Sequence, residues 1–133
     1  MESIKTTEQI KIKQIKTAKT IILDTNFLLI PYNYKIDIFS EIERICHFKY
    51  QLKILDKTLK ELENKKGSNL ALELINKKNI KVIKTKNSDY VDNILRKSKY
   101  IIATDDKELI KTIKDKPLII LKQKKYLMLK NVL

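Results

Sequence analysis

The chain has 133 residues, 43% of them hydrophobic, which suffices for one domain with a buried core and is too short for two ordinary domains. Its net charge of +13 favours a polyanionic partner, with nucleic acid preferred over an anionic membrane. The apolar runs are too short to span a membrane and the first residues lack a signal-peptide core, so we expect a cytoplasmic protein without a membrane partner. The single cysteine, Cys46, excludes an intramolecular disulfide and a cysteine zinc site.

Lysine supplies almost all of the positive charge, because only two of the 29 basic residues are arginine. Lysine ammonium groups act as point charges, which suit contacts with a phosphate backbone better than the reading of bases. An AT-rich genome would also enrich lysine and isoleucine without any selection for binding. If nucleic acid binds, we therefore expect recognition of shape and backbone rather than of sequence.

Short apolar runs alternate with helical periodicities along the chain. Residues 1–19 form a polar, Lys-rich N-terminal extension, either an edge strand around 10–12 or a frayed segment. The runs that we predict as strands are 20–24, 52–55, 80–83, 100–103 and 117–121. The predicted helices lie around 38–45, 59–62, 70–75, 91–95 and 109–113, with a break at 65–68 that contains the only glycine. Residues 122–133 are left as a basic and apolar C-terminal tail.

This alternation predicts the fold class. Strands that alternate with helices form β-α-β units, and therefore a mostly parallel sheet with helices on both faces. Uniformly apolar strands such as 118–121 fit strands that are covered on both sides. We therefore expect one α/β domain that spans residues 1–133.

Four acidic residues each lie near the point where an apolar run gives way to polar sequence: Asp24, Glu61, Asp92 and Asp106. In open parallel sheets, functional groups gather at the carboxyl ends of the strands. A cluster of carboxylates stays ionised only when cations neutralise it, and oxygen ligands favour hard divalent ions such as Mg²⁺ or Mn²⁺. A basic protein with such a site is suited to cutting phosphodiesters.

Each acid also has a purely structural interpretation. Asp24 can cap the following helix, and Asp106 can complement the dipole of its helix from the first turn. Glu61 and Asp92 each have a basic residue four positions away, which is the spacing of a surface ion pair on a helix. The order and context of all four acids, rather than any one of them, favour a shared site.

That order resembles the PIN-domain ribonuclease family over most of the chain, from about residue 21 to residue 121. Leu-Asp-Thr-Asn at Asp24 resembles the family's opening signature, and Glu61-Leu resembles its Glu-Leu pair after the second strand. Asp92 resembles the acid at the start of a later helix, and Thr104-Asp-Asp106 resembles the family's closing Thr-Asn-Asp motif. Asp105 departs from the pattern, because the family often has asparagine there, and we expect its side chain to point outward.

The resemblance implies a three-layer α/β/α sandwich, dependence on Mg²⁺ or Mn²⁺, and RNA as the substrate. It implies that Asp24, Glu61, Asp92 and Asp106 bind the metal and that the Thr104 hydroxyl orients the site. The implied function is a divalent-metal-dependent endoribonuclease, with rRNA processing as the leading role. A VapC-type toxin ribonuclease and a non-catalytic RNA-binding scaffold on the same fold are the alternatives.

The expected partner is RNA, with precursor rRNA as the leading candidate. A second copy of the chain is left open as a partner, and an antitoxin protein is expected only if the toxin interpretation holds. A Rossmann or P-loop nucleotide site would need glycines that this chain lacks. The lysines that we expect to bind RNA flank the apolar core at both ends of the sequence: Lys11, Lys13, Lys16, Lys122, Lys124 and Lys125.

Overall fold

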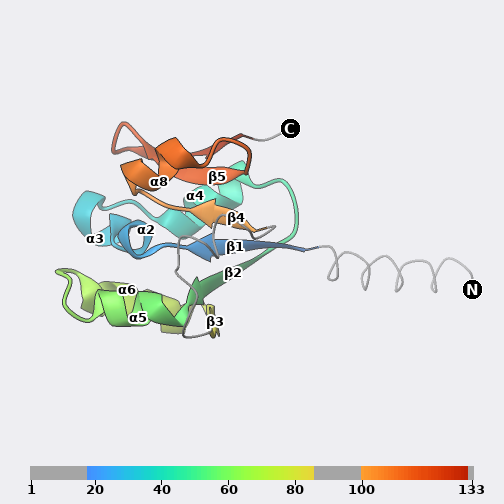
Figure 1. The fold of residues 1–133 in the computed structure, drawn as a ribbon. Helices are drawn as coiled ribbons and strands as arrows, with labels where there is room; N and C mark the ends of the chain where they lie inside the picture. The colour runs from blue at the N-terminus through green and yellow to red at the C-terminus, as the bar shows by residue number, and fades with distance from the viewer. Residues whose placement is uncertain (1–17, 86–99, 132–133) are drawn as a thin grey trace, which may run out of the picture.

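A computed structural model describes residues 18–85 and 100–131 of the chain. A sheet of six strands, in the order β3-β2-β1-β4-β5-β6, forms its centre (Figure 1). The strands are β1 (Lys19–Leu23), β2 (Tyr50–Leu55), β3 (Lys81–Ile83), β4 (Ile101–Ala103), β5 (Leu118–Lys122) and β6 (Tyr126–Lys130). The first five pair in parallel and β6 is antiparallel to β5, so the predicted mostly parallel sheet is confirmed.

The helices of the described residues are α2 (Thr25–Leu28), α3 (Ile30–Tyr34), α4 (Ile38–Ile45), α5 (Asp56–Leu62), α6 (Ser68–Lys77) and α8 (Lys107–Thr112). Helices α4, α5, α6 and α8 lie where helices were predicted, whereas the sequence pattern does not distinguish helix from loop over 26–34, where α2 and α3 lie. The helix predicted around 91–95 lies outside the described residues. The predicted break between α5 and α6 is confirmed at Gly67, whose φ is +91°. A Cβ at Gly67 would lie 2.5 Å from Cγ of Tyr32, so both the backbone conformation and the close approach require glycine. No helix in these residues is long and apolar enough to cross a membrane.

Apolar side chains cover both faces of the sheet, which gives the predicted three-layer α/β/α sandwich. Ile21 and Leu23 of β1 belong to the core beneath α2, α3 and α4, whereas Ile22 belongs to a second core beneath α8. Successive side chains of a strand point to opposite faces, so a strand covered on both sides must be apolar throughout. This arrangement explains the uninterrupted apolar runs in the sequence.

Residues 122–130 are not a tail, contrary to our expectation. They complete a β-hairpin in which Lys122 pairs with Tyr126 and Leu127 is 1% exposed. Gln123 and Lys124 make the turn with φ of +53° and +56°, and the Lys125 N–H donates to the Lys122 carbonyl at 3.0 Å. Asparagine and glycine are the usual residues at such positive φ values, so the sequence carried no turn signal here.

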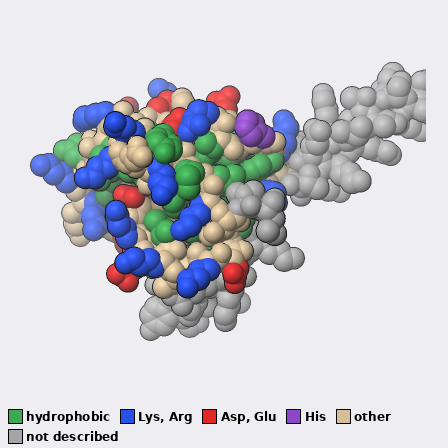
Figure 2. Space-filling model, turned by 90° about the horizontal axis from the view of Figure 1, so that it is seen from above, with side chains coloured by type: hydrophobic (Ala, Val, Ile, Leu, Met, Phe, Trp, Pro, Cys, Tyr) green, Lys and Arg blue, Asp and Glu red, His purple; other side chains and the backbone are tan. Residues whose placement is uncertain are grey.

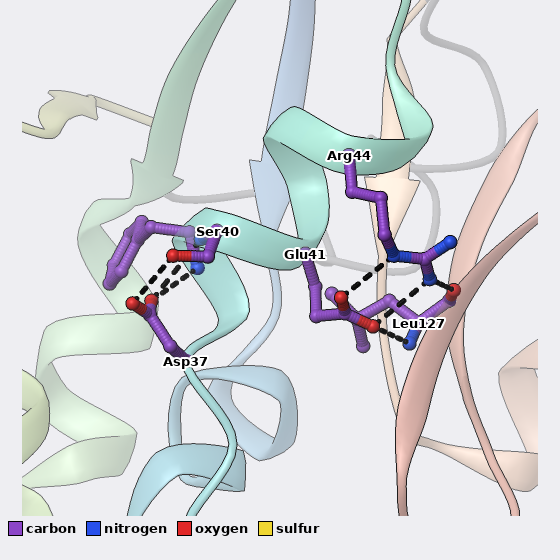
Figure 3. A network of polar contacts seen from close by, with 6 residues as sticks. Asp37, Ser40, Glu41, Arg44 and Leu127 are labelled. Atoms are coloured by element: carbon purple, nitrogen blue, oxygen red, sulfur yellow. Dashed lines mark hydrogen bonds and ion pairs between the residues drawn. The ribbon is translucent and has the colours of Figure 1, made fainter.

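Helix α4 is anchored to β6 by two of its side chains (Figure 3). Asp37 caps the N-terminus of the helix, and its carboxylate accepts hydrogen bonds from the amides of Phe39 and Ser40. One turn later, Glu41 accepts the Leu127 N–H at 3.0 Å, and Arg44 donates to the Leu127 carbonyl at 3.0 Å. Arg44 and Glu41 also form an ion pair at 2.8 Å. The hairpin is thereby fixed to the helical layer.

Glu41→Gln should lower the free energy of unfolding at pH 7 by about 0.5–1.5 kcal/mol. Arg44, and then the Leu127 amide, hold the pKa of Glu41 below its usual range. The charged form therefore stabilises the fold above the ordinary carboxyl pKa, and this stability is lost as the pH falls through the lowered value. Urea unfolding at several pH values measures the effect. Glu43→Gln, the same change at an exposed position of α4, is the control, and equal losses in both variants would contradict the prediction.

Candidate active site

The site lies at the carboxyl ends of the two central strands. Leu23 of β1 pairs with Ala103 of β4, so the residues that follow them, Asp24 and Thr104, leave the sheet side by side. The Asp24 N–H donates to the Ala103 carbonyl at 2.9 Å, which extends the pairing by one residue. The parallel register thus brings together two residues that are 80 positions apart in the chain.

The Asp24 carboxylate connects a helix start to the neighbouring strand. Its Oδ1 accepts the Thr25 N–H at 2.8 Å, and its Oδ2 accepts the Thr104 hydroxyl at 2.9 Å. A helix-capping acid typically binds the second or third amide of the helix. Asp24 instead binds the first amide of α2 and a side chain from β4, so capping alone does not account for its position.

Thr25 connects Asp24 to Glu61. The Thr25 hydroxyl is buried and donates to Oε2 of Glu61 at 2.7 Å, across 36 positions of the chain. Glu61 is exposed on α5, whose first residue directly follows β2. Thr25 belongs to the Leu-Asp-Thr-Asn signature, but the sequence did not predict its contact with Glu61. The sequence feature that could have indicated this contact is a hydroxyl residue directly after an acid at the end of a strand.

Asp106 joins the group through Thr104. The Asp106 N–H donates to the Thr104 hydroxyl oxygen at 3.0 Å, so this hydroxyl both donates to Asp24 and accepts from Asp106. Oδ1 of Asp106 caps α8 by accepting the amides of Glu108 at 3.0 Å and Leu109 at 3.4 Å. The structural interpretation therefore holds for one oxygen of Asp106. The other makes no hydrogen bond with the described residues.

These carboxylates influence one another electrostatically. Burial raises the pKa of Asp24, and the negative charges of Glu61 and Asp106 raise it further, while hydrogen bonds from Thr104 and Thr25 oppose the shift. Asp24 is therefore close enough to Glu61 and to Asp106 for the ionised carboxylates to repel it. A cation bound beside Asp24 would relieve this repulsion and so lower the electrostatic free energy of the site.

Asp56 shows how a structural acid differs at the same end of the sheet. It directly follows β2, but its oxygens accept the hydroxyl of Thr85 at 2.7 Å, the Thr85 amide at 3.2 Å and the Lys57 amide at 2.9 Å. These hydrogen bonds lower the pKa of Asp56, and the bond from the Thr85 hydroxyl has the largest effect. Asp24 and Asp56 thus occupy similar positions after neighbouring strands, yet their pKa values shift in opposite directions.

The donor chemistry of the site fits a hard divalent ion, since every candidate ligand is a carboxylate oxygen. Among residues 18–85 and 100–131, no three acidic, histidine or cysteine side chains are placed so that they could hold an ion together. The fourth predicted carboxylate, Asp92, lies outside this part of the chain. The structure thus brings Asp24, Glu61, Asp106 and Thr104 into one group and leaves their catalytic role a prediction.

The remaining predicted residues lie around this group. Asp105 lines a groove together with Lys107. Burial raises the pKa of Asp105, and the charge of Lys107 opposes the rise. Lys122, Lys124 and Lys125 are exposed at the β5–β6 turn. Figure 2 shows lysine and arginine side chains spread over one face of the molecule, most of them on the left side as drawn. The other predicted RNA ligands, Lys11, Lys13 and Lys16, precede the described residues.

Comparison with known proteins agrees with this geometry. The family model described as "PIN like domain" matches residues 21–124, which include Asp24, Glu61 and Asp106. The chain belongs to the PIN-domain family. Both the predicted family and the predicted fold are therefore confirmed.

Two similar PIN-domain proteins support this assignment. Ribonuclease VapC4 of Methanocaldococcus jannaschii is 36% identical over 124 residues, which cover 80% of this chain and 92% of that protein. The solved structure of the PIN domain endonuclease Utp24 superposes with a TM-score of 0.69 and 24% identity, and the match covers 85% of this chain and 92% of the Utp24 chain. At that identity the second likeness concerns the fold alone.

Proposed function

We propose that this PIN-domain protein is a divalent-metal-dependent endoribonuclease. The observation that carries the proposal is the group Asp24, Glu61 and Asp106, drawn together by the hydroxyls of Thr25 and Thr104 at the carboxyl ends of β1 and β4. The identity with a relative named as a ribonuclease supports RNA as the substrate. Asp92 is proposed as the fourth carboxylate on the basis of its sequence motif.

The carboxylates would hold the metal, and when bound it would supply Lewis acidity toward the phosphate and toward water. Thr104 fixes the rotamer of Asp24 and the backbone of Asp106 at once, so one hydroxyl sets the spacing of two acids. Thr25 similarly directs Oε2 of Glu61 inward, although the rest of that side chain is exposed. The protein thereby orients its oxygen ligands before any substrate arrives, which reduces the reorganisation needed for reaction.

Product analysis tests the reaction type. With Mn²⁺ and a labelled single-stranded RNA, we expect internal cleavage with 5′-phosphate ends and no cleavage in EDTA. The only histidine in the chain, His47, lies at the opposite end of the sheet, in the segment before β2, so a metal-free mechanism with two histidines has no residues to use. Cleavage in EDTA with 2′,3′-cyclic phosphate ends would overturn the proposal.

The exposed lysines at the β5–β6 turn are proposed to bind the RNA backbone near the site. Replacement of Lys122, Lys124 and Lys125 by glutamine should weaken RNA binding and leave the preferred cleavage sequence unchanged, because backbone contacts carry no sequence information. The log-log salt slope for single strands should flatten by about 0.7 for each lost contact, hence by about 2 in total. Anisotropy titrations at several salt concentrations measure this slope. An unchanged affinity and slope would assign these lysines to genome composition or solubility.

Two biological roles follow from different observations. The Lys-rich ends of the chain favour rRNA processing, which needs affinity for a large structured RNA. The 36% identity with a VapC ribonuclease favours a toxin of a toxin–antitoxin pair, with an antitoxin protein as partner. Induced expression in a bacterial host separates the two. A toxin should arrest growth only when Asp24 is intact, whereas a processing nuclease should leave growth unaffected and cut precursor rRNA in vitro.

A non-catalytic RNA-binding scaffold is the remaining alternative, because carboxylates can persist on a fold whose activity has been lost. A manganese titration distinguishes it from the nuclease. A scaffold would bind RNA equally well with and without Mn²⁺ and would not cleave it at any concentration of the ion.

A further inference from the structure

A groove of about 630 Å³ lies between α8 and the β5–β6 hairpin. Helix α8 and the residue before its cap contribute one wall, and the two strands contribute the other. The charged and aromatic side chains that line it are Asp105, Lys107, Lys111, Lys122, Tyr126 and Lys130. Among these residues only Lys122 has a role proposed above, as one of the turn lysines that bind the RNA backbone.

Local geometry explains why these side chains converge. Ile120 and Met128 pack in the core beneath α8, so Lys122, Tyr126 and Lys130, which are two residues away from one or the other, face the same side of the sheet. Lys122 lies directly opposite Tyr126 in the hairpin register. The α8 lysines at positions 107 and 111 are four residues apart, which places them on one face of the helix.

The groove combines positive charge with an exposed aromatic ring. Its lining has four lysines and one acid, Asp105. Tyr126 is 38% exposed, and no other tyrosine or phenylalanine in the described part of the chain is classed as exposed. Sites that bind single-stranded nucleic acid usually combine lysines that contact the backbone phosphates with an aromatic side chain on which a base stacks.

The groove opens beside the carboxylate group. Lys107, at one end of it, directly follows Asp106 and is the first residue of α8. Lys122 and Tyr126 lie at the same end of the sheet as Asp24, because β5 runs parallel to β4 and β1. An RNA strand bound in the groove can therefore reach the acids without crossing the sheet.

We propose that this groove binds the single-stranded RNA segment that continues from the cleaved phosphate, with the lysines on backbone phosphates and Tyr126 stacked on one base. The inference rests on the proposed ribonuclease function, because that function makes RNA the ligand at the adjacent site. The lysines attract backbone phosphates, which the acidic centre repels unless a cation is bound, and the tyrosine holds one nucleotide in place relative to the site.

Binding without cleavage tests the proposal independently of catalysis. Anisotropy of a fluorescent single-stranded RNA is measured in EDTA, at several salt concentrations, with four variants. The groove variant changes Lys107, Lys111 and Lys122 to glutamine, and the control variant makes the same change at the exposed lysines Lys49, Lys77 and Lys81, which do not line the groove. The other two variants are Tyr126→Leu and Tyr126→Phe. Circular dichroism confirms that each is folded.

The groove variant should lose affinity far beyond the control and flatten the salt slope by about 2. Tyr126→Leu should weaken binding by about 5- to 150-fold at an unchanged slope, and Tyr126→Phe should retain it, because a phenyl ring stacks as well. Equal losses of RNA affinity in the groove and control variants, or no effect of Tyr126→Leu on affinity, would overturn the proposal. The proposal would also fail if the groove variant lost binding of a poly-glutamate peptide but kept its binding of RNA. That result would indicate an acidic protein partner for the groove. Cleavage by the wild-type protein with Mn²⁺ is measured separately. Failure of the groove proposal can therefore be distinguished from failure of the ribonuclease proposal.

Discussion

Asp24→Asn should abolish RNA cleavage and, in the absence of divalent ions, raise the melting temperature of the protein. The activity loss should exceed the roughly 10- to 100-fold effect of changing a residue that only supports a metal ligand, because Asp24 is itself a proposed ligand. The gain in stability has a different origin. Burial and two neighbouring acids raise the pKa of Asp24, so its ionised form costs folding free energy that a neutral amide does not.

The pH dependence of this stability gain gives a second measurement. A carboxyl whose pKa is raised on folding destabilises the fold in full above the raised pKa, and the penalty disappears below the ordinary value of 3.8. The melting temperatures of wild type and Asp24→Asn should therefore converge as the pH falls from 7 toward that value. Added Mn²⁺ should stabilise the wild type more than the variant, because binding to the native state alone stabilises it.

Asp56→Asn is the matched control for this experiment. It removes the same charge at the same end of the sheet, but hydrogen bonds from Thr85 lower the pKa of Asp56. We therefore expect Asp56→Asn to reduce stability at pH 7 and to leave cleavage largely intact. If Asp24→Asn also destabilised the metal-free protein, the carboxylates would not be repelling one another and the argument for a cation site would fail.

Thr104→Val should have the second largest effect, although Thr104 is proposed to position other groups rather than to touch the RNA. The side chain is fully buried, and its hydroxyl donates to Asp24 and accepts from the Asp106 amide. Valine has the same shape but leaves both partners unpaired, which should cost about 1–3 kcal/mol of stability. Cleavage should fall by about 10- to 100-fold, as for other residues that orient metal ligands.

The Mn²⁺ dependence of activity separates positioning from simple destabilisation. Thr104→Val should need a higher Mn²⁺ concentration for half-maximal cleavage, and Thr104→Ser, which keeps the hydroxyl, should restore the wild-type concentration. Thr58→Val, at a buried threonine of α5, serves as a control for the loss of a buried hydroxyl. A Thr104→Val enzyme with an unchanged Mn²⁺ requirement would limit this residue to a structural role.

The architecture could be predicted because the apolar runs are short, regular and separated by helical periodicities. Strands covered on both faces leave an uninterrupted apolar signal, and the glycine between α5 and α6 marks the break that its positive φ requires. The hairpin at 122–130 could not be predicted in the same way. Its turn uses Gln123 and Lys124 where asparagine and glycine are usual, so tertiary pairing rather than local preference determines the strand.

The sequence predicted the three acids that the structure groups, Asp24, Glu61 and Asp106, whereas the fourth predicted acid, Asp92, lies outside the described residues. Acids at strand ends stand out in a basic chain, and parallel register brings Asp24 to the strand that precedes Asp106. The hydroxyls of Thr25 and Thr104 connect these acids. The resemblance already gave Thr104 the role of orienting the site, but the contact of Thr25 with Glu61 was not predicted, because threonine is too common in β-rich sequence to indicate a partner 36 positions away. The groove residue Tyr126 was missed for the same reason as the hairpin that carries it.

The anchoring of β6 by α4 also affects how this protein can associate with other chains. An open strand edge exposes unpaired amide and carbonyl groups onto which a foreign strand can add, with aggregation as the result. At Leu127 both outward groups are already bonded, the amide to Glu41 and the carbonyl to Arg44. Growth of the sheet past β6 is blocked there by two side chains of a single helix. The opposite edge is protected differently, because β3 has only three residues and its exposed Lys81 carries a charge.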